Sequence, residues 1–179
     1  MRPVAAATVS NVIVTHDKGA YLVVFDALVT ARVAKVREIL SDYTRWSRLS
    51  NRVRKSLVLE TFPHGRMRVI LDLRSCVLVF CKTIRQIKDL TERPNGDLFA
   101  VMVPEHSDFT SGWERWRIVA EGNETRVQYS ALLVPRSRVP PLLGRWVVAS
   151  NLRRTLTEAA NKLEILATAP THRIALQGG

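Results

Sequence analysis

Histidine and cysteine come first in a search for chemistry, because they supply many metal ligands, nucleophiles and general bases. The four histidines are scattered and form no His-x-x-x-His or Glu-x-x-His pair; they are His16, His64, His106 and His172. Two cysteines are too few for a four-cysteine zinc site. The sequence also lacks a Gly-x-Ser-x-Gly elbow and a glycine-rich phosphate loop. It therefore predicts no metal site and no cofactor.

The densest polar cluster is Glu105-His106-Ser107-Asp108. It has two interpretations. The side chains can supply an acid/base pair at the mouth of a cavity, or Ser107 and Asp108 can satisfy backbone groups within a turn. The second is favoured, since short polar residues of this kind are common in turns.

Cys76 and Cys81 are five positions apart. On one continuous strand they would lie on opposite faces, about 17 Å apart, whereas a disulfide needs Cα atoms within about 7 Å. They can pair only if the chain turns between them, so the cysteines do not identify the compartment.

Most of the secondary structure predicted from the sequence, which would hold any functional site in place, consists of strands. Residues 21–29, 53–61, 66–74, 77–90, 98–103, 111–120 and 125–134 are predicted strands, separated by turns at 63–65, 93–97 and 121–123. In residues 66–74, Met67, Val69, Leu71 and Leu73 alternate with mostly polar residues, as in a half-buried antiparallel strand. No good turn signal occurs between residues 66 and 92, and the reversal is expected near Ser75.

Three helices complete the prediction. Thr30 is expected to cap a helix over 31–40, and Asp42 a short one over 42–49 that places Trp46 and Leu49 on one face. Apolar residues every three or four positions from Leu142 to Leu166 indicate a long amphipathic helix, with Pro170 beyond its end. Residues 1–19 are predicted to be a loosely held arm and residues 168–179 a tail.

The net charge is +11, and no apolar run approaches the roughly 20 residues of a membrane-spanning helix. A basic chain suits an anionic partner, although a coding bias toward arginine would give the same charge. Nucleic acid ranks last among such partners, because no binding motif is present. The N-terminus lacks the apolar core of a signal peptide. Either the cytoplasm or, if a signal had been trimmed, the periplasm would fit.

One segment resembles a known family. Asp42-Tyr-Thr-Arg-Trp-Ser-Arg-Leu-Ser followed by Val53-Arg-Lys-Ser-Leu-Val-Leu-Glu is similar to a stretch of the START-like, or SRPBCC, superfamily, which includes polyketide cyclase/dehydrase-like and coenzyme Q-binding proteins. Residues 104–113 and 139–144 resemble a bacterial branch of it. The resemblance covers about residues 20–167. It implies an α+β helix-grip fold, in which a long C-terminal helix packs over a curved antiparallel sheet of about seven strands.

The resemblance further implies an elongated apolar cavity between sheet and helix. The residues expected to line it are Trp46, Met67, Val69, Leu71, Leu73, Trp116, Ile118, Tyr129, Ala131, Trp146, Asn151, Leu152 and Leu156. Tyr129 and Asn151 are the candidates for polar contacts. The expected mouth residues are His106, Asp108, Arg136, Arg138 and Arg145.

The favoured function is to bind or carry a hydrophobic small molecule such as a lipid or isoprenoid quinone, with peripheral contact to an anionic membrane. The alternatives are a cyclase- or hydrolase-like enzyme acting on a bulky apolar substrate, and an interaction module with a filled core. Two titratable groups within hydrogen-bond reach inside the cavity would favour the enzyme. The sequence does not predict an oligomeric state.

Overall fold

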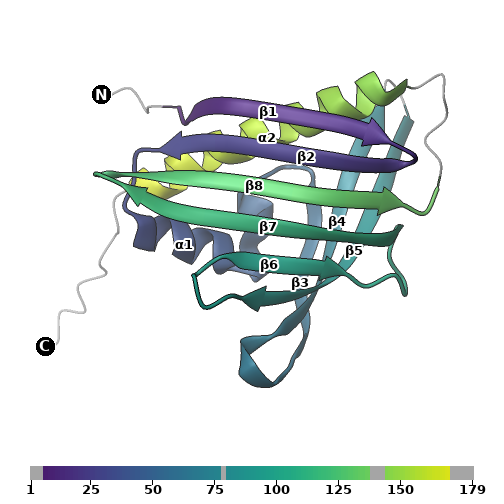
Figure 1. Cartoon of the computed structure of the whole chain (residues 1–179), viewed down its shortest axis with the longest axis horizontal. Helices are drawn as coiled ribbons and strands as arrows, with labels where there is room; N and C mark the ends of the chain where they lie inside the picture. The colour runs from purple at the N-terminus through teal and green to yellow at the C-terminus, as the bar shows by residue number, and fades with distance from the viewer. Residues whose placement is uncertain (1–5, 78–79, 138–143, 170–179) are drawn as a thin grey trace, which may run out of the picture.

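The computed structural model describes residues 6–77, 80–137 and 144–169 (Figure 1). Within them it has eight strands, two α-helices and two 3-10 helices. The strands are β1 (Thr8–Asp17), β2 (Ala20–Val29), β3 (Val53–Thr61), β4 (Met67–Val77), β5 (Phe80–Glu92), β6 (Leu98–Met102), β7 (Phe109–Glu121) and β8 (Glu124–Pro135). The helices are α1 (Val33–Ser41), η1 (Tyr43–Arg48), η2 (Pro63–Gly65) and α2 (Gly144–Thr168).

The strands form one antiparallel sheet in the order β1-β2-β8-β7-β6-β5-β4-β3. Figure 1 shows α1 and α2 on the same side of this sheet, with β4 and β5 crossing behind β7 and β8. The sheet therefore curves around the helices. This arrangement is the helix-grip fold expected from the sequence.

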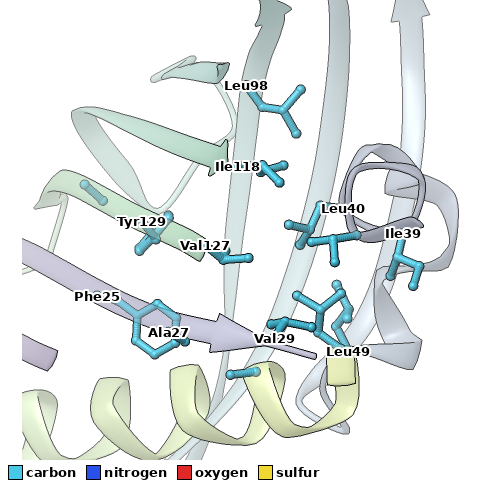
Figure 2. Packing of buried hydrophobic residues seen from close by; sticks show 14 of the residues in the cluster. Phe25, Ala27, Val29, Ile39, Leu40, Leu49, Leu98, Ile118, Val127 and Tyr129 are labelled. Carbon is cyan, nitrogen blue, oxygen red and sulfur yellow. The ribbon is translucent and has the colours of Figure 1, made fainter. Parts of the chain in front are cut away.

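Strict alternation in the central strands produces the buried face. In β8 every second residue from Thr125 to Leu133 is buried, and β2 alternates in the same way from Tyr21 to Val29. Because successive side chains on a strand point to opposite faces, all of these lie on the concave side. Figure 2 shows Phe25, Ala27 and Val29 of β2 packing toward α2, while Leu40 of α1 closes the same core.

The sheet has one strand more than expected, because residues 8–17 form β1 rather than a loose arm. β1 pairs with β2 in a hairpin from Thr8↔Leu28 to Asp17↔Ala20. The sequence signal was weak, since the apolar residues of β1 include the consecutive run Val12 to Val14 rather than a regular alternation. Pairing with β2 and packing of Val9, Val12 and Val14 against the core stabilise it.

The turn between β4 and β5 also differs from expectation. The strands remain paired as far as Val77↔Phe80, so the chain reverses beyond Ser75. Cys76 and Cys81 face each other in this register and form a disulfide. The sequence allowed this bond only if the chain turned between the cysteines, and it does.

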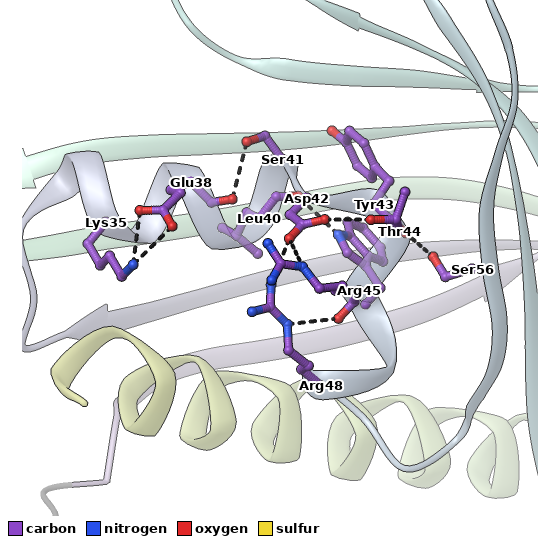
Figure 3. A network of polar contacts seen from close by, with 11 residues as sticks. Lys35, Glu38, Leu40, Ser41, Asp42, Tyr43, Thr44, Arg45, Arg48 and Ser56 are labelled. Carbon is purple, nitrogen blue, oxygen red and sulfur yellow. Dashed lines mark hydrogen bonds and ion pairs between the residues drawn. The ribbon is translucent and has the colours of Figure 1, made fainter. Parts of the chain in front are cut away.

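The segment after α1 is fixed by Asp42 (Figure 3). The carboxylate of Asp42 makes no helix cap, contrary to expectation, and instead accepts hydrogen bonds from Thr44 Oγ1 (2.8 Å), Arg45 Nε (2.5 Å) and Arg48 Nη2 (3.0 Å). Burial pushes the pKa of Asp42 upward, but these hydrogen bonds and charges lower it overall. Trp46, within this segment, donates from Nε1 to the Leu40 carbonyl at 3.0 Å. The network therefore holds the Trp46 ring against the core.

Helix α2 is joined to the rest of the fold by polar contacts along its length. Asn151 Nδ2 lies 3.4 Å from the Cys76 carbonyl, and Lys162 Nζ lies 2.6 Å from Asn51 Oδ1. Near the end of the helix, the buried Glu164 carboxylate accepts the backbone N–H of Thr30 at 2.7 Å. Thr30 was expected to cap α1. In the structure the N-cap is Arg32, without a side-chain cap bond, and Thr30 contributes to the docking of α2.

Candidate functional site

A cavity of about 150 Å³ lies between the concave face of the sheet and the helices. Its wall is mostly aliphatic and aromatic, with contributions from six strands, α1, the η1 region and α2. The lining residues are Phe25, Ala27, Val29, Leu40, Trp46, Leu49, Ser50, Val53, Leu71, Leu73, Gln86, Lys88, Glu114, Trp116, Val127, Tyr129, Leu133, Leu152, Thr155, Leu156, Ala159, Ala160 and Leu163.

The size of the cavity limits what it encloses in this conformation. An engineered apolar cavity of about 150 Å³ holds benzene, whereas pockets for drug-sized ligands span about 300–1,000 Å³. The space therefore accommodates one ring or a short length of chain. A longer ligand requires α2 or its neighbours to move outward.

Seven residues expected to line the cavity border it in the structure. They are Trp46, Leu71, Leu73, Trp116, Tyr129, Leu152 and Leu156. All but Trp46, which lies on η1, belong to the concave face of the sheet or to the apolar stripe of α2, which the sequence periodicity had indicated. Their contact with a ligand stays a prediction.

Other expected lining residues lie elsewhere. Met67 and Val69 pack with Tyr43 in a second apolar cluster farther along β4. Ile118 and Ala131 are buried within the main core, and Asn151 faces the β4 end rather than the cavity. The alternation gave the correct face of each strand, but not the position of the cavity along it. The side chain of Trp146 lies outside the described residues.

The loop expected at the cavity mouth is residues 105–108, and its polar groups form hydrogen bonds within the protein. Asp108 Oδ2 accepts the backbone N–H of Arg85 at 2.7 Å, and Ser107 Oγ accepts that of Phe109 at 3.2 Å. Arg136 donates to the carbonyls of Ser107 and Pro104. These bonds match the turn interpretation of the cluster.

His106, Asp108 and Arg136 are not among the cavity-lining residues. Arg138 and the side chain of Arg145 lie outside the described residues. An entrance at this loop stays a prediction.

A buried polar group at the cavity wall was missed by the sequence reasoning. Lys88 is 1% exposed and Glu114 is 3% exposed, and Lys88 Nζ lies 2.5 Å from Glu114 Oε2. The ammonium is also 3.4 Å from Gln86 Oε1 and 5.2 Å from the centre of the Trp46 ring. The sequence contained a signal for the buried position of Glu114, because the alternation of side chains along a strand places it on the same face of β7 as Trp116 and Ile118.

The negative charge of Glu114 acts on two buried tyrosines. Burial raises the pKa of Tyr129 well above its usual value, and Glu114 raises it further. Burial likewise raises the pKa of Tyr43, and the charge of Glu114 adds to the effect. Both phenols therefore stay protonated at neutral pH. At the cavity wall, Tyr129 supplies an O–H group beside a carboxylate already paired with Lys88.

Trp116 differs from Trp46 in its hydrogen bonding. Its ring packs against Tyr129 at 4.4 Å between centroids and edge-on to Trp46 at 6.1 Å. Its Nε1 is buried and has no hydrogen-bond partner among the described residues. Trp116 and Tyr129 therefore form an aromatic wall of the cavity, and the indole N–H of Trp116 is buried rather than exposed on that wall.

The chain matches the family described as polyketide cyclase / dehydrase and lipid transport over residues 23–166. It belongs to this family. The match spans most of the chain and includes every secondary element that borders the cavity. A comparison with curated protein sequences gives no match.

Solved structures share the fold of this family member. A START superfamily protein from Mycobacterium smegmatis is 20% identical, with a TM-score of 0.66 over 82% of this chain and 96% of that one. The Zhui aromatase/cyclase from Streptomyces sp. R1128 is 14% identical, with a TM-score of 0.68 over 83% and 93%. A STAR-related lipid transfer protein from Xanthomonas axonopodis is 16% identical, with a TM-score of 0.59 over 85% and 98%. At these identities the likeness concerns the fold.

The described residues hold no group of three or more His, Cys, Asp or Glu side chains placed to bind a metal ion. No helix among them is both long enough and apolar enough to cross a membrane.

Proposed function

We propose that this protein binds and carries a hydrophobic small molecule, such as a lipid or an isoprenoid quinone, between the sheet and α2. The observation that carries the proposal is the cavity itself, since a core of this kind is normally filled to crystal-like density. Here Leu152 and Leu156 of α2 face Trp116 and Tyr129 of the sheet across unfilled space. The driving force for binding would be burial of apolar area, about 25 cal/mol per Å².

The family description, which includes lipid transport, supports this proposal. The similarity of fold to a STAR-related lipid transfer protein is consistent with it. A ligand larger than a single ring would enter by separation of α2 from the sheet. Helix α2 forms one wall of the cavity, and its apolar residues pack on the sheet through side chains rather than through backbone hydrogen bonds.

Native mass spectrometry of gently purified protein tests the proposal. The expected result is a co-purified apolar molecule that adds mass to the folded protein and dissociates on collisional activation. In Ala159→Phe the added side chain would occupy the cavity and reduce the bound fraction. Val119→Phe, at an exposed position of β7, is the matched control and should leave it unchanged. A protein that neither co-purifies with nor takes up apolar molecules would contradict the proposal.

An enzyme of the cyclase type is the second candidate, and one observation favours it. Lys88 and Glu114 are titratable, lie within hydrogen-bond distance and border the cavity. Such a pair can exchange a proton with a bound substrate. The two functions differ in the fate of the ligand: a carrier releases the molecule unchanged, whereas a cyclase releases a product with altered bonding. Extraction and mass analysis after incubation with an aromatic polyketide substrate would separate them.

A further inference from the structure

We infer that the disulfide between Cys76 and Cys81 is an exchange site for small anionic thiols, which form a mixed disulfide with the protein through Cys76. The bond joins directly opposed residues of β4 and β5 near the end of their pairing. Neither cysteine borders the cavity, so this chemistry is separate from the proposed carrier function.

The disulfide is accessible from solvent. Cys81 is exposed and Cys76 is half-buried. Because side chains alternate along a strand, Cys76 points away from the face on which Leu71 and Leu73 line the cavity, and the bond therefore lies on the convex side of the sheet. Exchange requires a thiolate to reach a sulfur atom, and exposed disulfides are the ones that are commonly labile or regulatory.

The two strands do not depend on this bond for their pairing. β4 and β5 are partners from Met67↔Leu90 to Val77↔Phe80, on both sides of the cysteines. The cysteines are only five positions apart. In the chain-entropy model, a bond that closes so short a loop constrains the unfolded chain less than a long-range bond does. The disulfide can therefore open while the strands remain paired.

Arg74 identifies the sulfur that leaves. Its Nη2 donates to Cys81 Sγ at 3.5 Å, and Arg74 forms no ion pair among the described residues. The neighbouring Lys82 differs, because its ammonium lies 3.9 Å from the Asp108 carboxylate. A guanidinium beside a sulfur stabilises the thiolate, and a more stable thiolate leaves faster in exchange. Attack at Cys76, with departure of Cys81, is thus the favoured direction.

The reaction needs only the attacking thiol. That thiol loses its proton to the solvent, and its thiolate attacks Cys76 Sγ. A new S–S bond forms as the bond between Cys76 and Cys81 breaks, and the electron pair of the broken bond stays on Cys81 as a thiolate beside Arg74. The attacking sulfur is oxidised and Cys81 is reduced, so no other oxidant or reductant takes part. Attack of Cys81 on the mixed disulfide reverses the reaction.

The charge of Arg74 also selects the thiol. Its side chain is exposed and its charge is unmatched by a carboxylate among the described residues. A thiol that carries a carboxylate or sulfonate is attracted to such a charge, and a cationic thiol is repelled. Interactions between exposed charges are worth a factor of about 2 to 5 in a rate, and salt screens them.

Three thiols with the same two-carbon chain test the inference on the intact protein. Mercaptoethanesulfonate is anionic, mercaptoethanol is neutral and cysteamine is cationic. Each rate is divided by the rate of the same thiol with hydroxyethyl disulfide, a neutral reference that removes differences in nucleophilicity. We expect the relative rate of mercaptoethanesulfonate to exceed that of cysteamine about 2- to 5-fold at low salt. The difference should vanish in about 1 M NaCl, where the Debye length is about 3 Å.

The site of attack is read by mass spectrometry. Quenching with N-ethylmaleimide alkylates the freed cysteine and traps the mixed disulfide, which intact mass quantifies. Tandem mass spectrometry of the peptide that contains both cysteines should place the thiol on Cys76 and the maleimide on Cys81.

Variants of Arg74 separate its charge from its shape. Arg74→Gln should lower the rate with mercaptoethanesulfonate about 2- to 5-fold and reduce the preference over cysteamine. Arg74→Lys should retain most of both, because it keeps the charge. Arg117→Gln, at an exposed position of β7, removes one charge away from the disulfide and should change neither. Circular dichroism confirms that each variant is folded.

Four results would contradict the inference in different ways. Alkylation of both cysteines in the untreated protein would show that the bond is absent in solution. No reaction with any thiol, under conditions that open hydroxyethyl disulfide, would show that the bond does not exchange. A mixed disulfide on Cys81 would overturn the direction of attack. Equal relative rates for the three thiols at low salt would overturn the preference for anionic ones.

Discussion

At the scale of single residues, the least expected feature is an ion pair inside an apolar wall. Lys88 and Glu114 stand on β5 and β7, and their side chains are nearly inaccessible to water. Moving two charges out of water costs several kcal/mol each, and their attraction offsets that cost only when the geometry is good. The 2.5 Å separation and the nearby Gln86 amide and Trp46 ring provide such geometry.

Loss of one partner of this pair should be more damaging than loss of both. Lys88→Met leaves a buried, unpaired carboxylate, and we expect it to lower the free energy of unfolding by about 3–5 kcal/mol. Lys88→Met combined with Glu114→Met should recover most of the loss. Lys82→Met, whose side chain is 65% exposed, is the control and should change stability by no more than about 0.5 kcal/mol. Urea unfolding measures all three, and a double variant no more stable than Lys88→Met would contradict the expectation.

The buried Tyr129 predicts a loss of stability at alkaline pH. Its pKa is raised in the folded state by burial and by Glu114, whereas the unfolded chain ionises near pH 10. The Tyr129 contribution is therefore fully present below about pH 10 and is lost as pH rises toward the folded pKa. Tyr129→Phe should make the free energy of unfolding fall less steeply above about pH 10. Parallel slopes for the two proteins, from urea titrations at several pH values, would show that Tyr129 does not contribute.

At the scale of elements, α2 combines two kinds of position along one stripe. Leu156 and Leu163 both border the cavity, but Leu163 is 3% exposed and belongs to the main core, while Leu156 is only partly buried and packs against that core. The polar contacts at Asn151, Lys162 and Glu164 join the helix to three separate parts of the fold. The helix is thus a structural wall and also part of the candidate site.

Truncations along α2 should separate these roles. Leu163→Ala is expected to cost about 2–5 kcal/mol, because its side chain is almost fully buried. Leu156→Ala should cost less, because its side chain is only partly buried, and its main effect should fall on affinity for an apolar probe. Ile165→Ala, at a position that is 50% exposed, serves as the control and should alter neither. If Leu156→Ala changed neither thermal stability nor probe binding, α2 would present a different face to the cavity.

At the scale of the whole molecule, the net charge of +11 has a place in the proposed carrier function. A carrier must exchange its ligand at a membrane, and each lysine or arginine near an anionic leaflet contributes about 1 kcal/mol within a Debye length. Arg153 and Arg154 are exposed on α2 and form no ion pair among the described residues. They lie on the element that would move when a ligand enters.

We expect weak, salt-sensitive binding to anionic vesicles. Arg153→Gln with Arg154→Gln should reduce sedimentation with anionic vesicles at low salt, while probe affinity of the cavity persists because it depends on buried area. Arg54→Gln with Arg117→Gln, at exposed positions of β3 and β7, controls for the loss of two positive charges alone. Equal binding to neutral and anionic vesicles, or no binding to either, would remove the membrane role.

From β2 onward, local sequence patterns were enough to predict the order of the elements, the concave face of each central strand and the apolar stripe of α2. The physical reason is that periods of two and of about 3.6 residues identify a buried face from local information. The sequence also contained the family resemblance at Asp42–Ser50 and Val53–Glu60, which the family match over residues 23–166 confirms.

The position of the cavity along those faces, and the polar groups that border it, became evident only in the folded structure. Lys88 and Glu114 are 26 positions apart, and their pairing depends on the register of β5, β6 and β7. The pairing of Cys76 with Cys81 depends on the position of the turn, and β1 is stabilised by a partner strand and the core. Each of these features arises from contacts between segments, which no local pattern encodes.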